Sequence, residues 1–199
     1  MGNLFYRGQF DAYKLNNLNK SLESITESYT FDSSYHKIKT KIFISHKHDD
    51  LEDLKGIIGL LMELFNVDVY IDSHDKTMPK ITSGITAKKI KERIKKCDKF
   101  ILLATNGAIE SKWCNWELGF GDANKLEQNN LALFPMCDYA YSEKNYKGNE
   151  YLEIYPHIVY RDGTTTYSNG EIIPRGYYVR SKNKNGKFCM KPFNEWLEL

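Results

Sequence analysis

The chain has 199 residues, of which 41% are hydrophobic and 27% charged, enough for one ordinary domain with some additions. Its 14 Tyr, 10 Phe and 3 Trp argue against a disordered chain. A formal net charge of +2 lacks the basic excess of a non-specific binder of nucleic acids or anionic membranes. No apolar run approaches the roughly 20 residues that span a bilayer, and residues 1–10 lack the apolar segment of a signal peptide.

The four cysteines are widely spaced and form no C-x-x-C pair. This spacing is typical of reduced thiols in a cytosolic protein rather than of a disulfide framework or a zinc site. The cysteines concerned are Cys97, Cys114, Cys137 and Cys189.

Residues 1–40 are predicted to form a helical leader, with one helix over about 14–27. The helix follows from apolar residues at spacings of three and four, namely Leu15, Leu18, Leu22 and Ile25. Residues 41–45 (K-I-F-I-S) predict a buried strand. An amphipathic helix over 49–65 follows, with Asp49 or Asp50 as its N-cap.

Residues 67–72 (V-D-V-Y-I-D) are β-branched and aromatic and predict a second strand, followed by a turn-rich loop over 73–80. Thr82 or Ser83 is expected to cap the next helix. The residues that we expect this helix to turn inward are Ile85, Ile90, Ile94 and Cys97.

Residues 100–104 (F-I-L-L-A) predict a third buried strand, residues 111–127 a helix, and residues 131–137 a fourth strand. Pro135 places this last strand at or near the sheet edge, or ends it, because proline cannot donate to a ladder.

Residues 138–199 form a tyrosine-rich tail that we expect to pack on the core as an appended β-rich element. Residues 177–181 and 187–190 flank N-K-N-G and predict a hairpin. Residues 192–199 fit a short terminal helix.

Strands that alternate with helices and are buried on both sides predict a doubly wound parallel α/β domain over 41–137. Sites in such sheets form at the carboxyl ends of the strands. We therefore expect the functional residues within 45–50, 72–80 and 105–117.

The first of these segments, S-H-K-H-D-D, permits two interpretations. His46 and His48 resemble part of a metallohydrolase site, yet Leu51 stands where a further histidine is usual, and the chain has only five histidines. The alternative is a polar loop that also begins the next helix.

The last segment contains Trp113-Cys-Asn-Trp-Glu117. Trp113 and Glu117 are four residues apart and share one face of a helix, so the carboxylate lies beside a partly apolar wall. Such a glutamate can hold a sugar hydroxyl or stabilise a ribosyl cation. The alternative is an exposed glutamate on a helix with core tryptophans.

Asp72, at the end of the second strand, can accept a hydrogen bond from a ribose hydroxyl or cap its loop.

Several common motifs are missing from the sequence. It contains no G-x-G-x-x-G, no G-x-x-x-x-G-K-[ST] and no G-x-S-x-G, so Rossmann, P-loop and hydrolase-elbow sites are unsupported.

Taken together, residues 41–50, 67–72, 90–105 and 111–118 resemble the Toll/interleukin-1 receptor (TIR) domain, particularly the stand-alone bacterial kind. The W-x-x-x-E segment is the most specific part of this resemblance. The loop departs from the family pattern, because Met78-Pro79 is followed by Lys80 rather than glycine.

The resemblance implies a flavodoxin-like sheet and cleavage of NAD⁺ at the nicotinamide–ribose bond, with Glu117 as the catalytic residue. Ser45, His46, Asp72 and Trp113 are then the expected substrate-binding residues, with no metal and no cofactor besides NAD⁺ as substrate.

The length and the tail are similar to those of the TIR proteins of Thoeris anti-phage systems. This similarity implies a cytoplasmic enzyme whose ADP-ribose-derived product, linear or cyclic, activates a separate effector protein. It also implies TIR–TIR self-association, with neither nucleic acid nor membrane as partner. A non-catalytic TIR scaffold that acts by assembly is the alternative.

Overall fold

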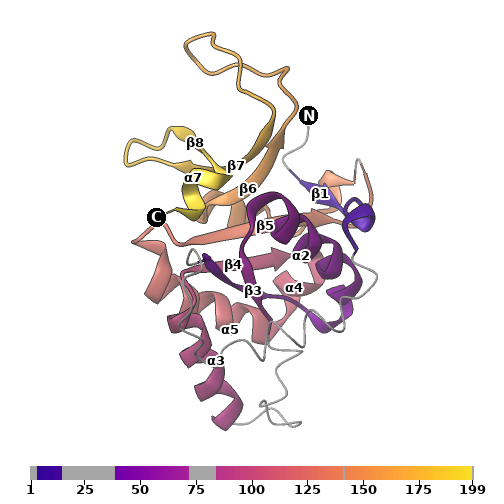
Figure 1. Cartoon of the computed structure of the whole chain (residues 1–199), viewed down its shortest axis with the longest axis vertical. Coiled ribbons are helices and arrows are strands. Elements are labelled where there is room, and N and C mark those ends of the chain that lie inside the picture. The colour runs from indigo at the N-terminus through magenta and orange to yellow at the C-terminus, as the bar shows by residue number, and fades with distance from the viewer. Residues whose placement is uncertain (1–3, 15–38, 72–83, 141, 199) are drawn as a thin grey trace.

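The computed structural model describes residues 4–14, 39–71, 84–140 and 142–198. In this part of the chain an eight-stranded sheet has the order β3-β2-β4-β5-β6-β7-β8, with β1 beside β5 (Figure 1). Its parallel strands are β2 (Lys41–Ser45), β3 (Asp68–Tyr70), β4 (Lys99–Ala104), β5 (Leu131–Cys137) and β6 (His157–Arg161). If these five parallel strands are numbered 1 to 5 in chain order, starting from β2, they lie across the sheet in the order 2-1-3-4-5. This is the flavodoxin-like arrangement. The predicted α/β fold is confirmed.

Helices cover both faces of the sheet because successive side chains of each buried strand point to opposite sides. In β2, Ile42 and Ile44 belong to the core under α2 (Leu51–Phe65) and α7 (Phe193–Leu197). Phe43 belongs to the opposite core. The helices on that second face are α3 (Gly84–Lys96), α4 (Asn106–Glu110), α5 (Lys112–Gly121) and α6 (Asn149–Ile154).

The position predicted for β5 is wrong, since this strand lies inside the sheet rather than at its edge. On the side away from β4, the Leu133 N–H donates to the Pro156 carbonyl, and the Cys137 carbonyl accepts from the Arg7 N–H. On this side β5 pairs with β6 at Leu133 and with β1 from Met136 onward, and Pro135 lies between the two pairings. The missing N–H of Pro135 therefore interrupts no ladder.

Helix α3 confirms the inward positions of Ile90, Ile94 and Cys97, which are all buried. The inward prediction for Ile85 is wrong, because 64% of this residue is exposed. It lies in the first turn of the helix, beyond the end of the stripe that faces the sheet. The predicted caps Thr82 and Ser83 lie outside the described residues.

The helix predicted over 111–127 is preceded by a further helix, α4, and the two meet at a corner. Thr105 begins α4, and its Oγ1 accepts from the Ala108 N–H at 3.0 Å. Ser111 begins α5 in the same way, its Oγ accepting from the Cys114 N–H at 3.3 Å. A π-helical turn (Asp122–Leu126) continues α5.

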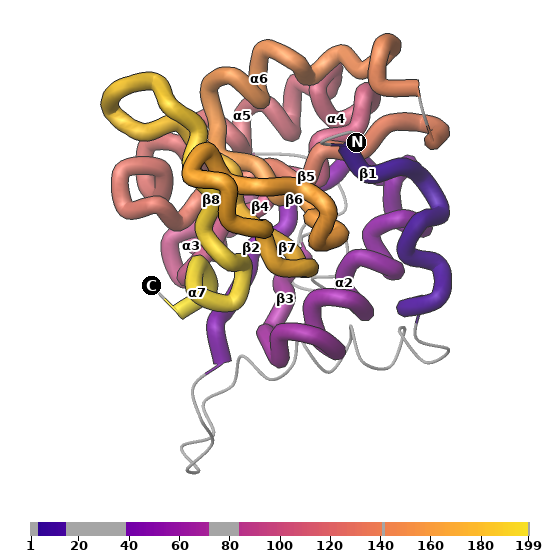
Figure 2. Tube along the Cα trace, turned by 90° about the horizontal axis from the view of Figure 1, so that it is seen from above, coloured from indigo at the N-terminus to yellow at the C-terminus, as the bar shows by residue number. Residues whose placement is uncertain are grey.

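The N-terminal segment packs against α2 (Figure 2). Strand β1 (Phe5–Tyr6) pairs with the end of β5, and a 3₁₀ turn (Asp11–Tyr13) follows. A Cβ added at Gly59 would lie 1.9 Å from the Tyr13 carbonyl oxygen. This close approach requires glycine on α2. The helix predicted over 14–27 falls almost wholly outside the described residues.

The predicted hairpin is confirmed as β7 (Gly176–Lys182) and β8 (Phe188–Pro192), and the predicted terminal helix as α7. Both hairpin strands extend the sheet beyond β6 (Figure 1). The division of the chain at residues 40 and 137 stays a prediction, although the sheet continues across the second of these boundaries.

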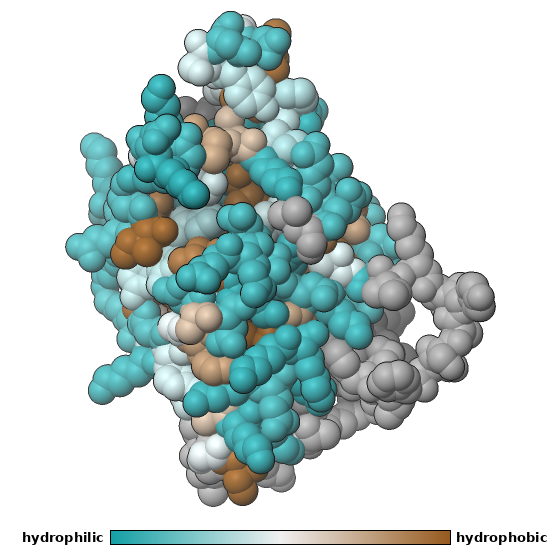
Figure 3. Space-filling view, turned by 90° about the vertical axis from the view of Figure 1, so that its left-hand side faces the viewer, coloured by the Kyte–Doolittle hydropathy of each residue, from teal (hydrophilic) through white to brown (hydrophobic). Residues whose placement is uncertain are grey.

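Figure 3 shows one side of the molecule as mostly hydrophilic, with isolated hydrophobic residues. Among the described residues, no helix is long and apolar enough to cross a membrane.

Candidate active site

Ser45 and Glu117 meet at the carboxyl end of β2. Ser45 is the last residue of this strand, and its Oγ donates to Oε2 of Glu117 on α5 at 2.5 Å. Only 1% of Glu117 is exposed, and Ser45 is fully buried. The strand order reverses between β2 and β4, so this contact lies at the topological switch point where α/β sheets place their ligands. Glu117 is therefore not the exposed glutamate of an ordinary amphipathic helix.

Trp113 lies one turn before Glu117 on α5 and is half-buried. Its ring stacks on that of Trp116, with centroids 4.8 Å apart. Both rings pack at the border of the core under α5 rather than inside it. The pair is an apolar surface on the helix that carries Glu117, and the role of Trp113 beside the carboxylate stays a prediction.

Of the remaining candidates from the sequence, His46 and His48 lie among the described residues and Asp72 does not. His46 is 7% exposed, with Nδ1 3.5 Å from the Ile44 carbonyl oxygen, whereas His48 is exposed in the turn that follows. Over the described ranges, no group of three or more His, Cys, Asp or Glu side chains is arranged to hold a metal ion. Asp72 and the 73–80 loop lie outside the described residues.

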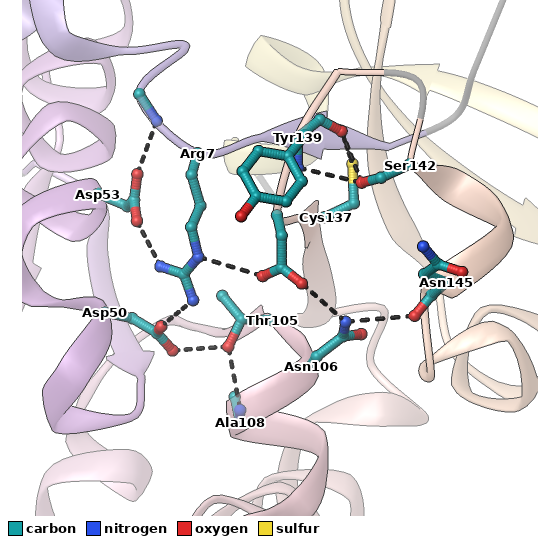
Figure 4. Close-up of polar contacts among 12 residues, drawn as sticks. Arg7, Asp50, Asp53, Thr105, Asn106, Ala108, Cys137, Tyr139, Ser142 and Asn145 are labelled. Carbon is teal, nitrogen blue, oxygen red and sulfur yellow. Dashed lines mark hydrogen bonds and ion pairs between the residues drawn. The ribbon is translucent and has the colours of Figure 1, made fainter.

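A second polar cluster lies at the same sheet edge and is centred on Arg7 (Figure 4). The Arg7 guanidinium contacts Asp50 at 2.6 Å, Asp53 at 2.5 Å and Asp138 at 3.4 Å. Burial lowers the pKa of Arg7, but hydrogen bonds and charge from Asp50 and Asp53 outweigh this effect and raise it overall. Arg7 therefore stays charged and joins β1, the start of α2 and the end of β5.

Asp50 was predicted as one of two N-caps for the 49–65 helix, and it holds the N-cap position without a side-chain capping bond. Its carboxylate is buried and instead accepts from Arg7 and from the Thr105 hydroxyl, the latter at 2.6 Å. Thr105 also caps α4. One carboxylate thus links the loops that follow β2 and β4, the two strands that flank the switch point.

The corner between α4 and α5 is fixed by Asn115. Its Nδ2 donates to the carbonyls of Ile109 and Ser111 at 2.8 and 2.9 Å, and its Oδ1 accepts from the Tyr151 hydroxyl at 2.6 Å. Because Glu117 follows two residues later, this corner sets where its carboxylate points.

A family model described as "TIR domain" matches residues 42–167, which is more than half of the chain. The chain belongs to the TIR domain family. Over 186 residues it is 30% identical to the "Probable 3' cyclic ADP-D-ribose synthase ThsB'" of Bacillus cereus (strain MSX-D12), covering 83% of this chain and 93% of that protein. Among solved structures, a Clostridium botulinum CMP N-glycosidase, BcmB, is 23% identical with a TM-score of 0.32, covering 51% of this chain and 76% of that one.

The sequence analysis assigned no role to four residues that support this site. Arg7 directly follows a two-residue strand that pairs with β5 across more than 130 residues, so no local pattern marks it. Tyr151 and Asn115 are ordinary helix residues whose contact depends on the placement of α6. Thr105 carried a usable signal, since a threonine that follows a buried strand and precedes N-G-A is a good N-cap.

Proposed function

We propose that this TIR protein cleaves NAD⁺ at the nicotinamide–ribose bond and forms an ADP-ribose-derived signalling nucleotide in anti-phage defence. The observation that carries the proposal is the buried Glu117 carboxylate, held by Ser45 at the switch point of a TIR sheet. The Bacillus cereus relative, named as a probable 3' cyclic ADP-D-ribose synthase, supports the same reaction class.

The chemistry suits a single carboxylate. The C–N glycosidic bond breaks with its electron pair passing to the nicotinamide nitrogen, so that nicotinamide leaves as a neutral molecule. The ribose is left with oxocarbenium character, which a carboxylate stabilises best where water and its high dielectric constant are excluded. A water molecule, or a hydroxyl of the same ADP-ribose, then adds to the anomeric carbon and loses its proton.

The surrounding residues position the reaction. Ser45 donates to one oxygen of Glu117 and thereby fixes the plane of the carboxylate. We assign Trp113 to the apolar wall beside the ribose and His46 to substrate contact at the end of β2. Asp72 is proposed to flank the same site. The reaction needs no cofactor besides NAD⁺, which is the substrate.

The biological setting is a further part of the proposal. The four cysteines all lie in the described residues and form no disulfide, and three of them are buried, which suits a reducing cytoplasm. We propose that the protein self-associates through its TIR domain and that its product acts on a separate effector protein.

Mass spectrometry of the NAD⁺ reaction tests the function directly. We expect equimolar nicotinamide and an ADP-ribose-derived nucleotide, whose mass distinguishes a cyclic product from a hydrolysed one by one water. If the assembled protein releases no nicotinamide while its oligomers form normally, the enzyme proposal is wrong and the scaffold alternative takes its place.

A further inference from the structure

Helix α6 belongs to the tail, yet it lies along α5, the helix that carries Glu117 (Figure 2). Two tyrosine hydroxyls join the two helices. Tyr151 donates to Oδ1 of Asn115 at 2.6 Å, and Tyr155 donates to Oδ2 of Asp122 at 3.0 Å. Asn115 lies in the first half of α5 and Asp122 is its C-cap, so the two contacts hold α5 before and after Glu117 along the chain.

The period of the helix sets the two contacts and the Glu117 carboxylate on opposite sides of α5. Asn115 and Asp122 are seven residues apart and share one face. Glu117 follows Asn115 by two residues, about 200° around the helix, and therefore projects from the other side. That side carries the hydrogen bond from Ser45. A rotation of α5 that loosens the tyrosine contacts consequently shifts the carboxylate.

The segment before α6 is anchored to the end of β4 and the start of α4. The buried Tyr146 hydroxyl donates to the Ala104 carbonyl at 2.9 Å, and the Lys147 N–H donates to Oδ1 of Asn106 at 2.9 Å. The two tyrosines of the α6 contacts also pack against the core under α5. Helix α6 therefore has a defined position from which its hydroxyls can hold α5.

The direction of each hydrogen bond follows from the groups involved. Burial raises the pKa of Tyr155 to about 12, and the hydrogen bond and charge of Asp122 add to this effect, so the hydroxyl stays protonated at neutral pH. The Nδ2 group of Asn115 donates to two carbonyls at the α4–α5 corner, which leaves its oxygen to accept from Tyr151. Both hydrogen bonds thus run from the tail to α5.

We propose that α6 is part of the catalytic apparatus, with Tyr151 and Tyr155 as positioning residues that hold α5 and thereby fix the orientation of the Glu117 carboxylate. This inference rests on the proposed NAD⁺ cleavage at Glu117. It gives the tail a role in that reaction that does not require the tail to bind a ligand.

Steady-state kinetics of nicotinamide release by the full chain test this proposal with Tyr151→Phe, which keeps the ring and removes only the hydroxyl. We expect kcat to fall by about two- to tenfold, the factor that one neutral hydrogen bond supplies. The KM for NAD⁺ should stay within about twofold of the native value. Tyr178→Phe is the matched control, because its hydroxyl donates to the Pro174 carbonyl inside the tail, and it should leave kcat unchanged. Equal kcat values in the two variants overturn the proposal.

A double variant separates positioning from a loss of folded protein. In the Asn115→Ala background the Tyr151 hydroxyl has lost its acceptor on α5, so Tyr151→Phe should have no further effect on kcat there. A further fall as large as in the native background means that Tyr151 acts by general destabilisation, which contradicts the proposal. If circular dichroism reports that Asn115→Ala is unfolded, the same comparison is made with Tyr155→Phe in the Asp122→Ala background.

Hydrogen–deuterium exchange tests the contact between the helices without reference to activity. Amides of residues 112–121 should exchange faster in Tyr151→Phe than in the native chain or in Tyr178→Phe, while those of residues 41–45 keep their native rate. Unchanged exchange in residues 112–121 contradicts the proposal. If the native chain releases no nicotinamide, the proposed reaction is wrong and the positioning role falls with it. If nicotinamide is released but kcat does not respond to Tyr151→Phe, only the positioning role is wrong.

Discussion

At the scale of single residues, the central contact is the hydrogen bond between Ser45 and Glu117. It joins a strand end to a helix across 72 residues of sequence and leaves both side chains buried. A buried carboxylate with a fixed donor is oriented before substrate arrives, which is the condition under which electrostatic stabilisation is most effective. In the proposed reaction Ser45 acts through Glu117 as a positioning residue.

Ser45→Ala removes this donor without changing the backbone. Hydrogen bonds to charged groups contribute about 1.5–3 kcal/mol, so we expect kcat for nicotinamide release to fall by about tenfold or more. The KM for NAD⁺ should stay within about twofold, because the lost interaction orients the carboxylate rather than holding the substrate. Ser45→Cys keeps a near-isosteric but weaker donor, so its kcat should lie between those of the native protein and Ser45→Ala. A change confined to KM would contradict this role.

His157 gives a pH-dependent contribution to stability. Burial, reinforced by the charges of Arg180 and Arg161, lowers the pKa of this histidine to about 4, despite a hydrogen bond to the Tyr155 carbonyl. The unfolded chain therefore binds an extra proton between about pH 6.5 and 4, so stability is full above pH 6.5 and falls as the pH drops through this window.

The loss across the whole window has an upper limit of about 3.5 kcal/mol, from about 1.4 kcal/mol per pH unit over about 2.5 units. Urea denaturation at pH 7 and pH 5 measures the part of this loss that falls above pH 5. His157→Asn, which does not titrate, should show a smaller difference between the two pH values than the native chain. An equal difference in both proteins would contradict the assignment to His157.

At the scale of elements, the N-terminal segment stabilises the edge of the sheet that carries the site. Its position depends on the glycines of α2, above all Gly59. Gly59→Ala should therefore destabilise the chain by about 1–3 kcal/mol, because the new methyl group overlaps the Tyr13 carbonyl. The matched control is Gly119→Ala on α5, where an added Cβ meets no atom within 4 Å. Helix propensity predicts a gain of about 0.5–1 kcal/mol there. Thermal denaturation distinguishes the two, and equal melting temperatures would contradict the packing account.

Arg7 connects that segment to the loops around the switch point. Arg7→Met leaves the buried Asp50 carboxylate with its hydrogen bond from the Thr105 hydroxyl but without the guanidinium. We expect a loss of about 2 kcal/mol, below the 3–5 kcal/mol of fully buried pairs because Arg7 is one-third exposed. Lys147→Met, which breaks an exposed pair with Glu110, should leave the stability almost unchanged. Losses of equal size in denaturant titrations would contradict the special role of Arg7.

At the scale of the whole molecule, local patterns were sufficient for the central sheet. Apolar runs and helical stripes predicted β2, α2, β4 and β5 nearly to the residue, and the family resemblance pointed to Glu117. The sequence could not reveal what depends on long-range contact. Strand β1 has two residues and no periodicity, and the true position of β5 follows only once β6 and β1 are placed.

The tail illustrates the same limit. Its tyrosines suggested an appended element, yet Tyr151 supports the α4–α5 corner, and the hydroxyl of Tyr146 donates to the Ala104 carbonyl at the end of β4. Part of the aromatic surplus therefore packs around the site itself. Composition alone records the surplus but contains no information on which strand end each ring reaches.

The rate of nicotinamide release from NAD⁺ by Glu117→Gln, compared with Glu127→Gln, tests the central claim most directly. Both variants remove one carboxylate, but Glu127 is exposed beyond the end of α5. The account predicts a rate lower by at least about 10²–10³ for Glu117→Gln, with Glu127→Gln equal to the native protein. Equal rates for the two variants would contradict the assignment of Glu117 as the catalytic carboxylate.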